Sequence, residues 1–141
     1  MTLYAVFEND DLQILVTGDR AGLYGLAALL AGGQLAMLSL DQPPPPALQG
    51  QAQSLDAIEV RPNVGPDGRV SFARSGRRLV IGGDGAEIAR IVAEPIADLA
   101  DGPAAINTIS AHLHFDPASD PDCDYHVPGC IPIVVGYETT G

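Results

Sequence analysis

The chain has few basic residues and no lysine. Seven arginines stand against eighteen acidic residues among 141, and the formal net charge is −11. Proteins that bind nucleic acid or anionic membranes need local positive charge, so this composition argues against both classes. The same imbalance favours a partner that carries positive charge. The acidic residues are unevenly spread: six of them occur from Asp101 onward, where there is no arginine.

Long apolar runs and cysteines are also scarce. No segment reaches the ~18 consecutive apolar residues that span a membrane. No basic segment precedes the first apolar residues, as it would in a secretory signal. We therefore expect no membrane insertion and a cytoplasmic location. In that reducing compartment Cys123 and Cys130 are expected as thiols, and a disulfide between them stays open as an alternative.

The stretch from Leu79 to Leu99 predicts a strand, a turn and an amphipathic helix. Its first three residues are apolar and suit a buried strand. Asp84 with Glu87 three residues later is typical of a capped helix start. Pro95 has no N–H to donate, so we expect a kink there or an early end of the helix. The apolar residues at helical spacing are Ile88, Ile91, Val92, Ile96 and Leu99.

A shift of 65 residues places this unit on an earlier one. Without a gap, Phe72 falls on Phe7 and Leu79 falls on Ile14, and the Gly-Asp turn at 83–84 falls on the one at 18–19. Agreement of the turn as well as the apolar positions favours an internal duplication. Two repeats, at about 4–61 and 69–138, would share one core because neither half buries much surface alone. We therefore expect a single domain over 1–141.

Each half has the pattern strand-strand-helix-strand-strand. The expected fold class is α+β: an antiparallel-rich sheet of about eight strands with two helices packed on one face. One continuous sheet and two stacked sheets both remain open. Pro132 either begins the last strand or places it at a sheet edge. The expected strands are 2–8, 12–17, 34–40, 55–61, 69–74, 77–81, 109–115 and 131–137, and the first helix is 20–31.

Two further segments are expected at the surface. Four consecutive prolines at 43–46 predict an exposed connection, since proline gives no ladder donors. Five of the seven arginines crowd the middle of the chain, and we expect them on the solvent-facing sides of strands and turns. They are Arg61, Arg69, Arg74, Arg77 and Arg78.

Residues 111–130 are dense in reactive side chains. His112 and His114 are two apart on a predicted strand, so both point to the same face. Together with Cys123 and His126 they form a candidate zinc site. Their spacing matches no standard zinc motif, and histidines hydrogen-bonded within the fold are the favoured interpretation. A catalytic cysteine–histidine pair has no supporting sequence pattern.

Two other candidate sites, a calcium loop and a phosphate site, are excluded by the residues at their key positions. Asp120, Asp122 and Asp124 resemble the start of a calcium loop, but Tyr125 and Ile131 stand where an EF-hand needs Gly and Glu. A solvated acidic loop is favoured instead. The Gly-rich turn before the second helix carries Asp84, which would repel a phosphate at that helix N-terminus. The residues on their own indicate no enzyme.

Three stretches of the second half carry a family resemblance. They are LVIGGDGAEIARIVAEPIADLA from Leu79, HLHFD from His112 and PGCIPIVVGYE from Pro128. They resemble immunity protein family 32 of bacterial polymorphic toxin systems, over about residues 69–138. These small α+β proteins have a strand ending in Gly-Asp, a helix, an H-x-H-x-D strand and a final apolar strand. His112, His114 and Asp116 match the histidine motif, and Asp84 matches the helix-start acid.

The resemblance implies a protein without enzymatic activity that binds and neutralises a cognate toxin. An acidic inhibitor pairs well with a basic toxin. The contact residues expected on that basis are Asp116, Asp120, Asp122 and Asp124, with Tyr125 as an aromatic anchor. No cofactor is implied. The first half has LAMLSL in place of the histidines, so only the second half would have a histidine-dependent function.

Two alternatives stay open. One is a metal-binding protein or metal-dependent enzyme that uses His112, His114, Cys123 and His126, with zinc as the metal. The other is a self-associating module in which the final apolar strand lies at an edge and pairs in a homodimer.

Overall fold

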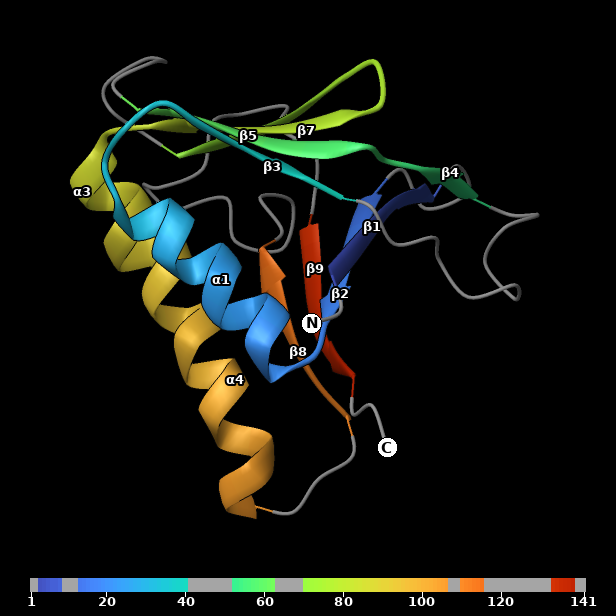
Figure 1. Ribbon diagram of the computed structural model, residues 1–141, viewed down its shortest axis with the longest axis vertical. Coiled ribbons are helices and arrows are strands. Elements are labelled where there is room, and N and C mark those ends of the chain that lie inside the picture. The colour runs from blue at the N-terminus through green and yellow to red at the C-terminus, as the bar shows by residue number, and fades with distance from the viewer. Residues whose placement is uncertain are drawn as a thin grey trace.

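The computed structural model describes residues 3–8, 13–40, 52–62, 70–106, 110–115 and 133–138. Among these residues no helix is long and apolar enough to cross a membrane. The fold is α+β, as the sequence predicts (Figure 1). Its first elements are β1 (Leu3–Glu8), β2 (Gln13–Gly18), α1 (Arg20–Ala31), β3 (Ala36–Ser39), β4 (Ala52–Ser54) and β5 (Ala57–Pro62). There follow β6 (Ser71–Ser75), β7 (Arg78–Gly83), α3 (Gly85–Ile88), η2 (Ala89–Ala93), α4 (Glu94–Ile106), β8 (Ser110–Phe115) and β9 (Ile133–Glu138).

The strands are divided between two sheets. Sheet A has the order β4-β1-β2-β9-β8, and sheet B has the order β3-β5-β7-β6. Pairing is antiparallel except between β2 and β9 and between β5 and β7, which confirms the antiparallel-rich expectation. The described residues hold nine strands, because the short strand β4 joins the eight that the sequence predicts.

Each sheet combines strands from both halves of the chain. The hairpin β1–β2 pairs in parallel with β9, the last strand of the second half. The hairpin β6–β7 pairs in parallel with β5, the last strand of the first half. The two halves therefore exchange strands reciprocally, and both are needed to complete either sheet. The duplication itself stays a prediction.

The hairpins differ in length, which corrects the alignment of the two halves. The last pair before the first turn is Glu8–Gln13, whereas the second hairpin closes at Ser75–Arg78. The shift of 65 residues makes Ile81 equivalent to Val16. Ile81 is paired with Phe72, whereas Val16 is paired with Ala5, so the structural equivalent of Phe72 is Ala5. The gap-free match of Phe72 to Phe7 is wrong, because the second loop is two residues shorter.

The two helical segments lie side by side against both sheets (Figure 1). Residues of α1 and of the η2–α4 segment join residues of sheets A and B in one apolar core. The inward positions expected from helical spacing in the second helix are all buried, from Ile88 to Leu99, and α1 buries Leu23, Leu26, Ala27 and Leu30. A cavity of about 10 Å³ between Val16, Ile58, Val92 and Val135 is too small for a ligand.

Both helices begin at the predicted aspartates. Asp19 accepts a hydrogen bond from the Gly22 N–H at 2.8 Å, and Asp84 accepts one from the Glu87 N–H at 3.3 Å. The second helix does not end at Pro95. It continues to Ile106 through η2, a π-helical stretch directly before the proline. There the Glu94 N–H donates to the carbonyl of Ala89, so a local change of helix register takes the place of an early end.

The final strand lies inside a sheet. β9 pairs with β2 on one side and with β8 on the other. An edge position for this strand is therefore wrong, and so is a homodimer that pairs through it. β9 begins at Ile133, and Pro132 itself lies outside the described residues.

Candidate functional site

β8 is the edge strand of sheet A that carries the histidine motif. His112 pairs with Gly136 and His114 pairs with Val134 of β9. Leu113 between them packs against the core. The structure confirms the strand that places the two histidines two residues apart, and their side chains lie outside what it describes.

The other predicted site residues lie in the connection between β8 and β9. Phe115 and Ile133 are paired directly, so residues 116–132 leave and re-enter sheet A at the same end of neighbouring strands. The described residues do not include this segment. It holds Asp116, Asp120, Asp122, Cys123, Asp124, Tyr125, His126 and Cys130.

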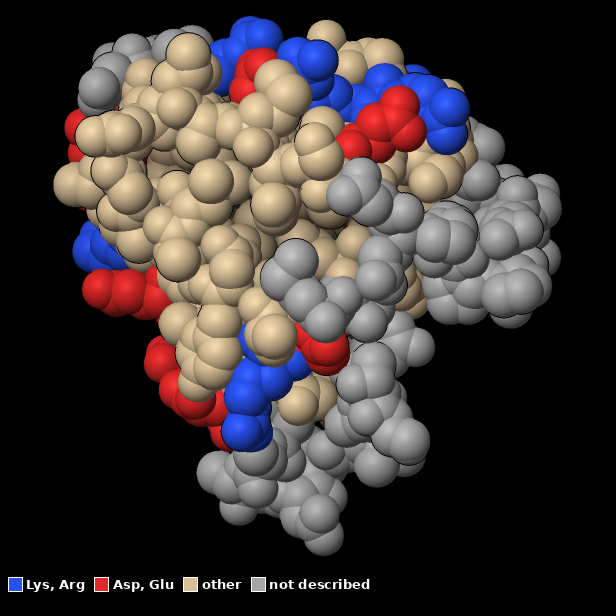
Figure 2. Space-filling model, viewed as in Figure 1, with Lys and Arg blue, Asp and Glu red and all other residues tan. Residues whose placement is uncertain are grey.

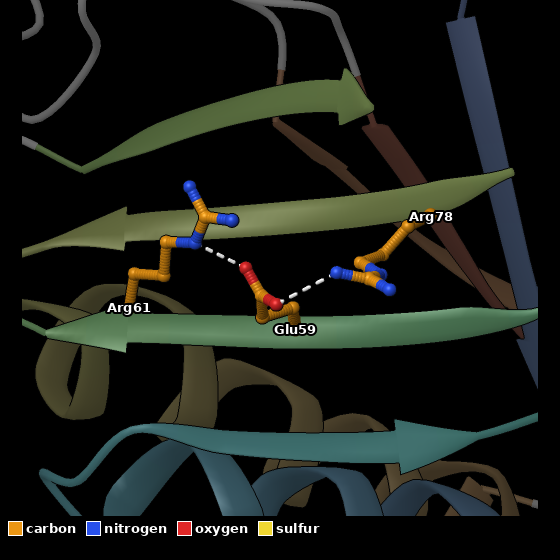
Figure 3. A network of polar contacts seen from close by, with 3 residues as sticks. All are labelled: Glu59, Arg61 and Arg78. Carbon is orange, nitrogen blue, oxygen red and sulfur yellow. Dashed lines mark hydrogen bonds and ion pairs between the residues drawn. The ribbon is translucent and has the colours of Figure 1, made fainter. Parts of the chain in front are cut away.

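The outer face of sheet B carries a charged network that the sequence did not predict. Glu59 of β5 lies between Arg61 of the same strand and Arg78 of β7 (Figure 3). Arg78 donates from Nη1 to Glu59 Oε1 at 2.9 Å, and Arg61 donates from Nε to Oε2. The Glu59 side chain is only 8% exposed, whereas those of Arg61 and Arg78 are 47% and 41% exposed. The carboxylate thus fixes two guanidinium groups that still reach solvent.

A weak sequence signal for this network exists. Glu59 and Arg61 are two apart in a strand, so they share a face and have opposite charges. Arg78 is contributed by another strand, and only the parallel pairing of β5 with β7 brings it near. The apolar residues on both sides of Glu59 predict a buried strand, so the sequence gives little reason to expect a charged network on it.

Two further arginines from the middle of the chain, Arg74 and Arg77, join the two sheets at one corner. Arg74 of β6 lies over the ring of Phe7 in β1, 4.2 Å from its centroid, and donates to Gln53 of β4 at 2.6 Å. Arg77 donates to the carbonyl of Ser54 at 3.1 Å. The expectation of solvent-facing arginines is correct for the described members, and Arg69 lies outside the described residues.

These arrangements offer binding chemistry. The two guanidinium groups held by Glu59 can bind carboxylate or phosphate groups, since each has further N–H donors. Asp84 acts as a helix cap. Within the described ranges, no three His, Cys, Asp or Glu side chains gather in a way that could hold a metal ion. The chain matches no protein-family model, no curated protein and no solved structure.

Proposed function

We propose that the chain is an immunity protein of a bacterial polymorphic toxin system, which binds and neutralises a cognate toxin by direct contact. The observation that carries the proposal is the direct pairing of Phe115 with Ile133. This pairing brings both ends of the connection 116–132, whose sequence contains Asp116, Asp120, Asp122 and Asp124, to one end of sheet A. Four carboxylates within nine residues of the sequence, on a chain of net charge −11, would attract a basic toxin surface.

The order of elements in the second half supports the same proposal. β7 ends at Gly83, Asp84 caps the helix that follows, β8 carries His112 and His114, and the apolar strand β9 comes last. This is the order that the resemblance to immunity protein family 32 implies. The proposal places the protein in the cytoplasm, where a toxin made by the same cell is first met.

The first test is a pull-down from the native host with this protein as bait. We expect a stoichiometric partner that is encoded in the neighbouring gene and is toxic when expressed alone. Co-expression of the bait should then restore growth. Failure to capture such a partner from cells that express the neighbouring gene would contradict the proposal.

The contact surface is tested by changing Asp120, Asp122 and Asp124 together to Asn. The association rate constant with the captured toxin should fall at least about tenfold at low salt, and the difference should shrink as salt screens the charges. The matched control changes the exposed acids Glu94, Asp98 and Asp101 of α4 to amides, which gives the same change in net charge outside the acidic segment. Equal losses in both variants would show that only net charge matters and would exclude the acidic segment as the contact.

A metal-binding function is the second candidate, favoured by the observed strand that carries His112 and His114. With Cys123 and His126 they would supply nitrogen and sulfur ligands suited to zinc. Elemental analysis of protein purified without a histidine tag tests this directly. About one zinc per chain, lost on changing His112 and His114 to Ala, would favour the metal protein, and no zinc would exclude it.

A further inference from the structure

The chain contains one long stretch without charge that reaches the surface. No residue from Ala21 to Leu40 is charged, and this stretch forms most of α1, the following turn and β3. The exposed large apolar side chains of the described residues all lie in it: Tyr24 is 39% exposed, Leu35 74% and Met37 50%. Figure 2 shows the uncharged area over α1 and β3, with charged side chains gathered around it.

The rest of the molecule shows that this surface is unusual for the fold. The second helix occupies the matching place beside α1, yet its outer side carries the exposed residues Arg90, Glu94, Asp98 and Asp101. On α1 the exposed residues after Arg20 are Ala21, Tyr24, Gly25, Ala28 and Ala31. An uncharged surface that exposes large apolar side chains marks an interaction site more often than a charged, solvated face does.

The two edge strands of sheet B also differ in charge. β6 at one edge carries Arg74, and Arg77 follows in the turn. β3 at the other edge has no charge and no proline, the two features that usually prevent edge strands from pairing with other chains. Met37 lies on the outer face opposite Glu59, and Leu35 directly precedes the strand.

We propose that this surface, formed by α1, the turn at 32–35 and β3, binds a second copy of the chain. The β3 strands would pair antiparallel about a two-fold axis, which places Met37 beside Met37 of the partner subunit and extends sheet B across both copies. The unprotected edge of β3 favours this occupant, because antiparallel pairing makes an edge strand complementary to its own copy. Two chains of net charge −11 repel each other, and the repulsion is least where the facing surface is uncharged. A basic partner gains nothing from that face and is drawn to the acidic ones.

The dimer does not depend on the proposed immunity function, and it is tested on the full chain alone. Sedimentation velocity across the micromolar range should show a species of twice the chain mass that dissociates on dilution. Changing Leu35 and Met37 together to Lys should raise the dissociation constant at least tenfold. Lysine lowers the net negative charge of the whole chain, so a weaker dimer would come from the β3 interface itself, where the new charges would be buried and would face their own copies. A wild-type chain that stays monomeric at every concentration overturns the proposal.

The matched control changes Ala73 and Ser75 on β6 to Lys, which adds the same charge at the opposite edge of the same sheet. It should dimerise like the wild type, and an equal loss in the control overturns the assignment of the surface. Hydrogen exchange gives a second measurement on the unaltered chain. Amides of residues 34–40 should become more protected as concentration rises, while those of 71–75 should not change. A dimer without that protection contradicts pairing through β3.

Discussion

At the scale of single residues, the polar contacts differ sharply in how much water reaches them. The Glu59 side chain is 8% exposed and contacts two arginines, whereas Glu87 is 40% exposed and its partner Arg90 is 66% exposed. Ion pairs in water contribute little, because solvent screens them and their ordering costs side-chain entropy. A buried carboxylate depends on its partners much more strongly, since it has lost its own water.

This contrast predicts the effect of removing each carboxylate. Glu59→Gln should lower the free energy of unfolding by about 1–2 kcal/mol, because two charge-assisted hydrogen bonds weaken. Glu87→Gln serves as the matched control and should cost less than about 0.5 kcal/mol. Urea denaturation of both variants measures the difference. A cost for Glu59→Gln no greater than for Glu87→Gln would show that the network is only a surface contact.

At the scale of elements, each helix start depends on one aspartate. Asp19 and Asp84 each follow a strand that ends in glycine, and each accepts a backbone N–H of the first helical turn. Gly83 has a φ of 133°, a conformation open to glycine and strained for other residues, and it turns the chain from β7 into the helix. The strand-to-helix connection is thus fixed by two residues.

We predict that Asp19→Ala lowers the free energy of unfolding by about 1 kcal/mol, because Gly22 loses its cap acceptor. Asp84→Ala should cost less, since its hydrogen bond of 3.3 Å is longer than the 2.8 Å bond of Asp19. Asp19→Asn keeps an acceptor oxygen and serves as the control. Denaturant unfolding measures the order of stability of these variants, from their midpoints, provided that the dependence of the free energy on denaturant is the same in each. An Asp19→Ala variant as stable as the Asn variant would refute the capping role.

These elements were predictable because their signals are local. The alternation of apolar and polar residues, the helical spacing from Ile88 to Leu99 and the cap residues place most strands and helix starts within one or two residues. The pairing of strands was not predictable. Each of β2, β5, β7 and β9 is six residues long and contains several apolar residues, so no local signal determines that β2 pairs with β9. The same holds for the charged network of sheet B. Glu59 and Arg61 are two residues apart in the sequence, so their proximity was predictable, whereas Arg78 is brought near only by the pairing of β5 with β7.

At the scale of the whole molecule, charge is the dominant feature. A net charge of −11 on 141 residues repels itself in the folded state more than in the expanded unfolded chain. Added salt screens this repulsion within a Debye length of about 10 Å at 0.1 M. Burial partly shields the ion pairs of Glu59 from salt, so low salt concentrations should weaken the repulsion between surface charges more than these ion pairs.

We therefore predict that the thermal unfolding midpoint rises as sodium chloride increases from low ionic strength to about 0.15 M, where screening reaches about 8 Å. Measurement at one low protein concentration keeps self-association from contributing. The Glu94, Asp98 and Asp101 amide variant has less charge and should show a smaller rise. A midpoint that falls with salt would mean that attractive pairs outweigh the repulsion.

The position of β9 between β2 and β8 has a consequence for synthesis on the ribosome. The strand that β2 requires as its parallel neighbour is more than a hundred residues further along the chain. The nascent protein therefore exposes one side of the β1–β2 hairpin until β9 leaves the exit tunnel. Sheet B needs nothing beyond residue 83 and can pair earlier. We expect a chain stalled near residue 110 to recruit chaperones through the unpaired edge of β2, and emergence of β9 from the ribosome to end that dependence.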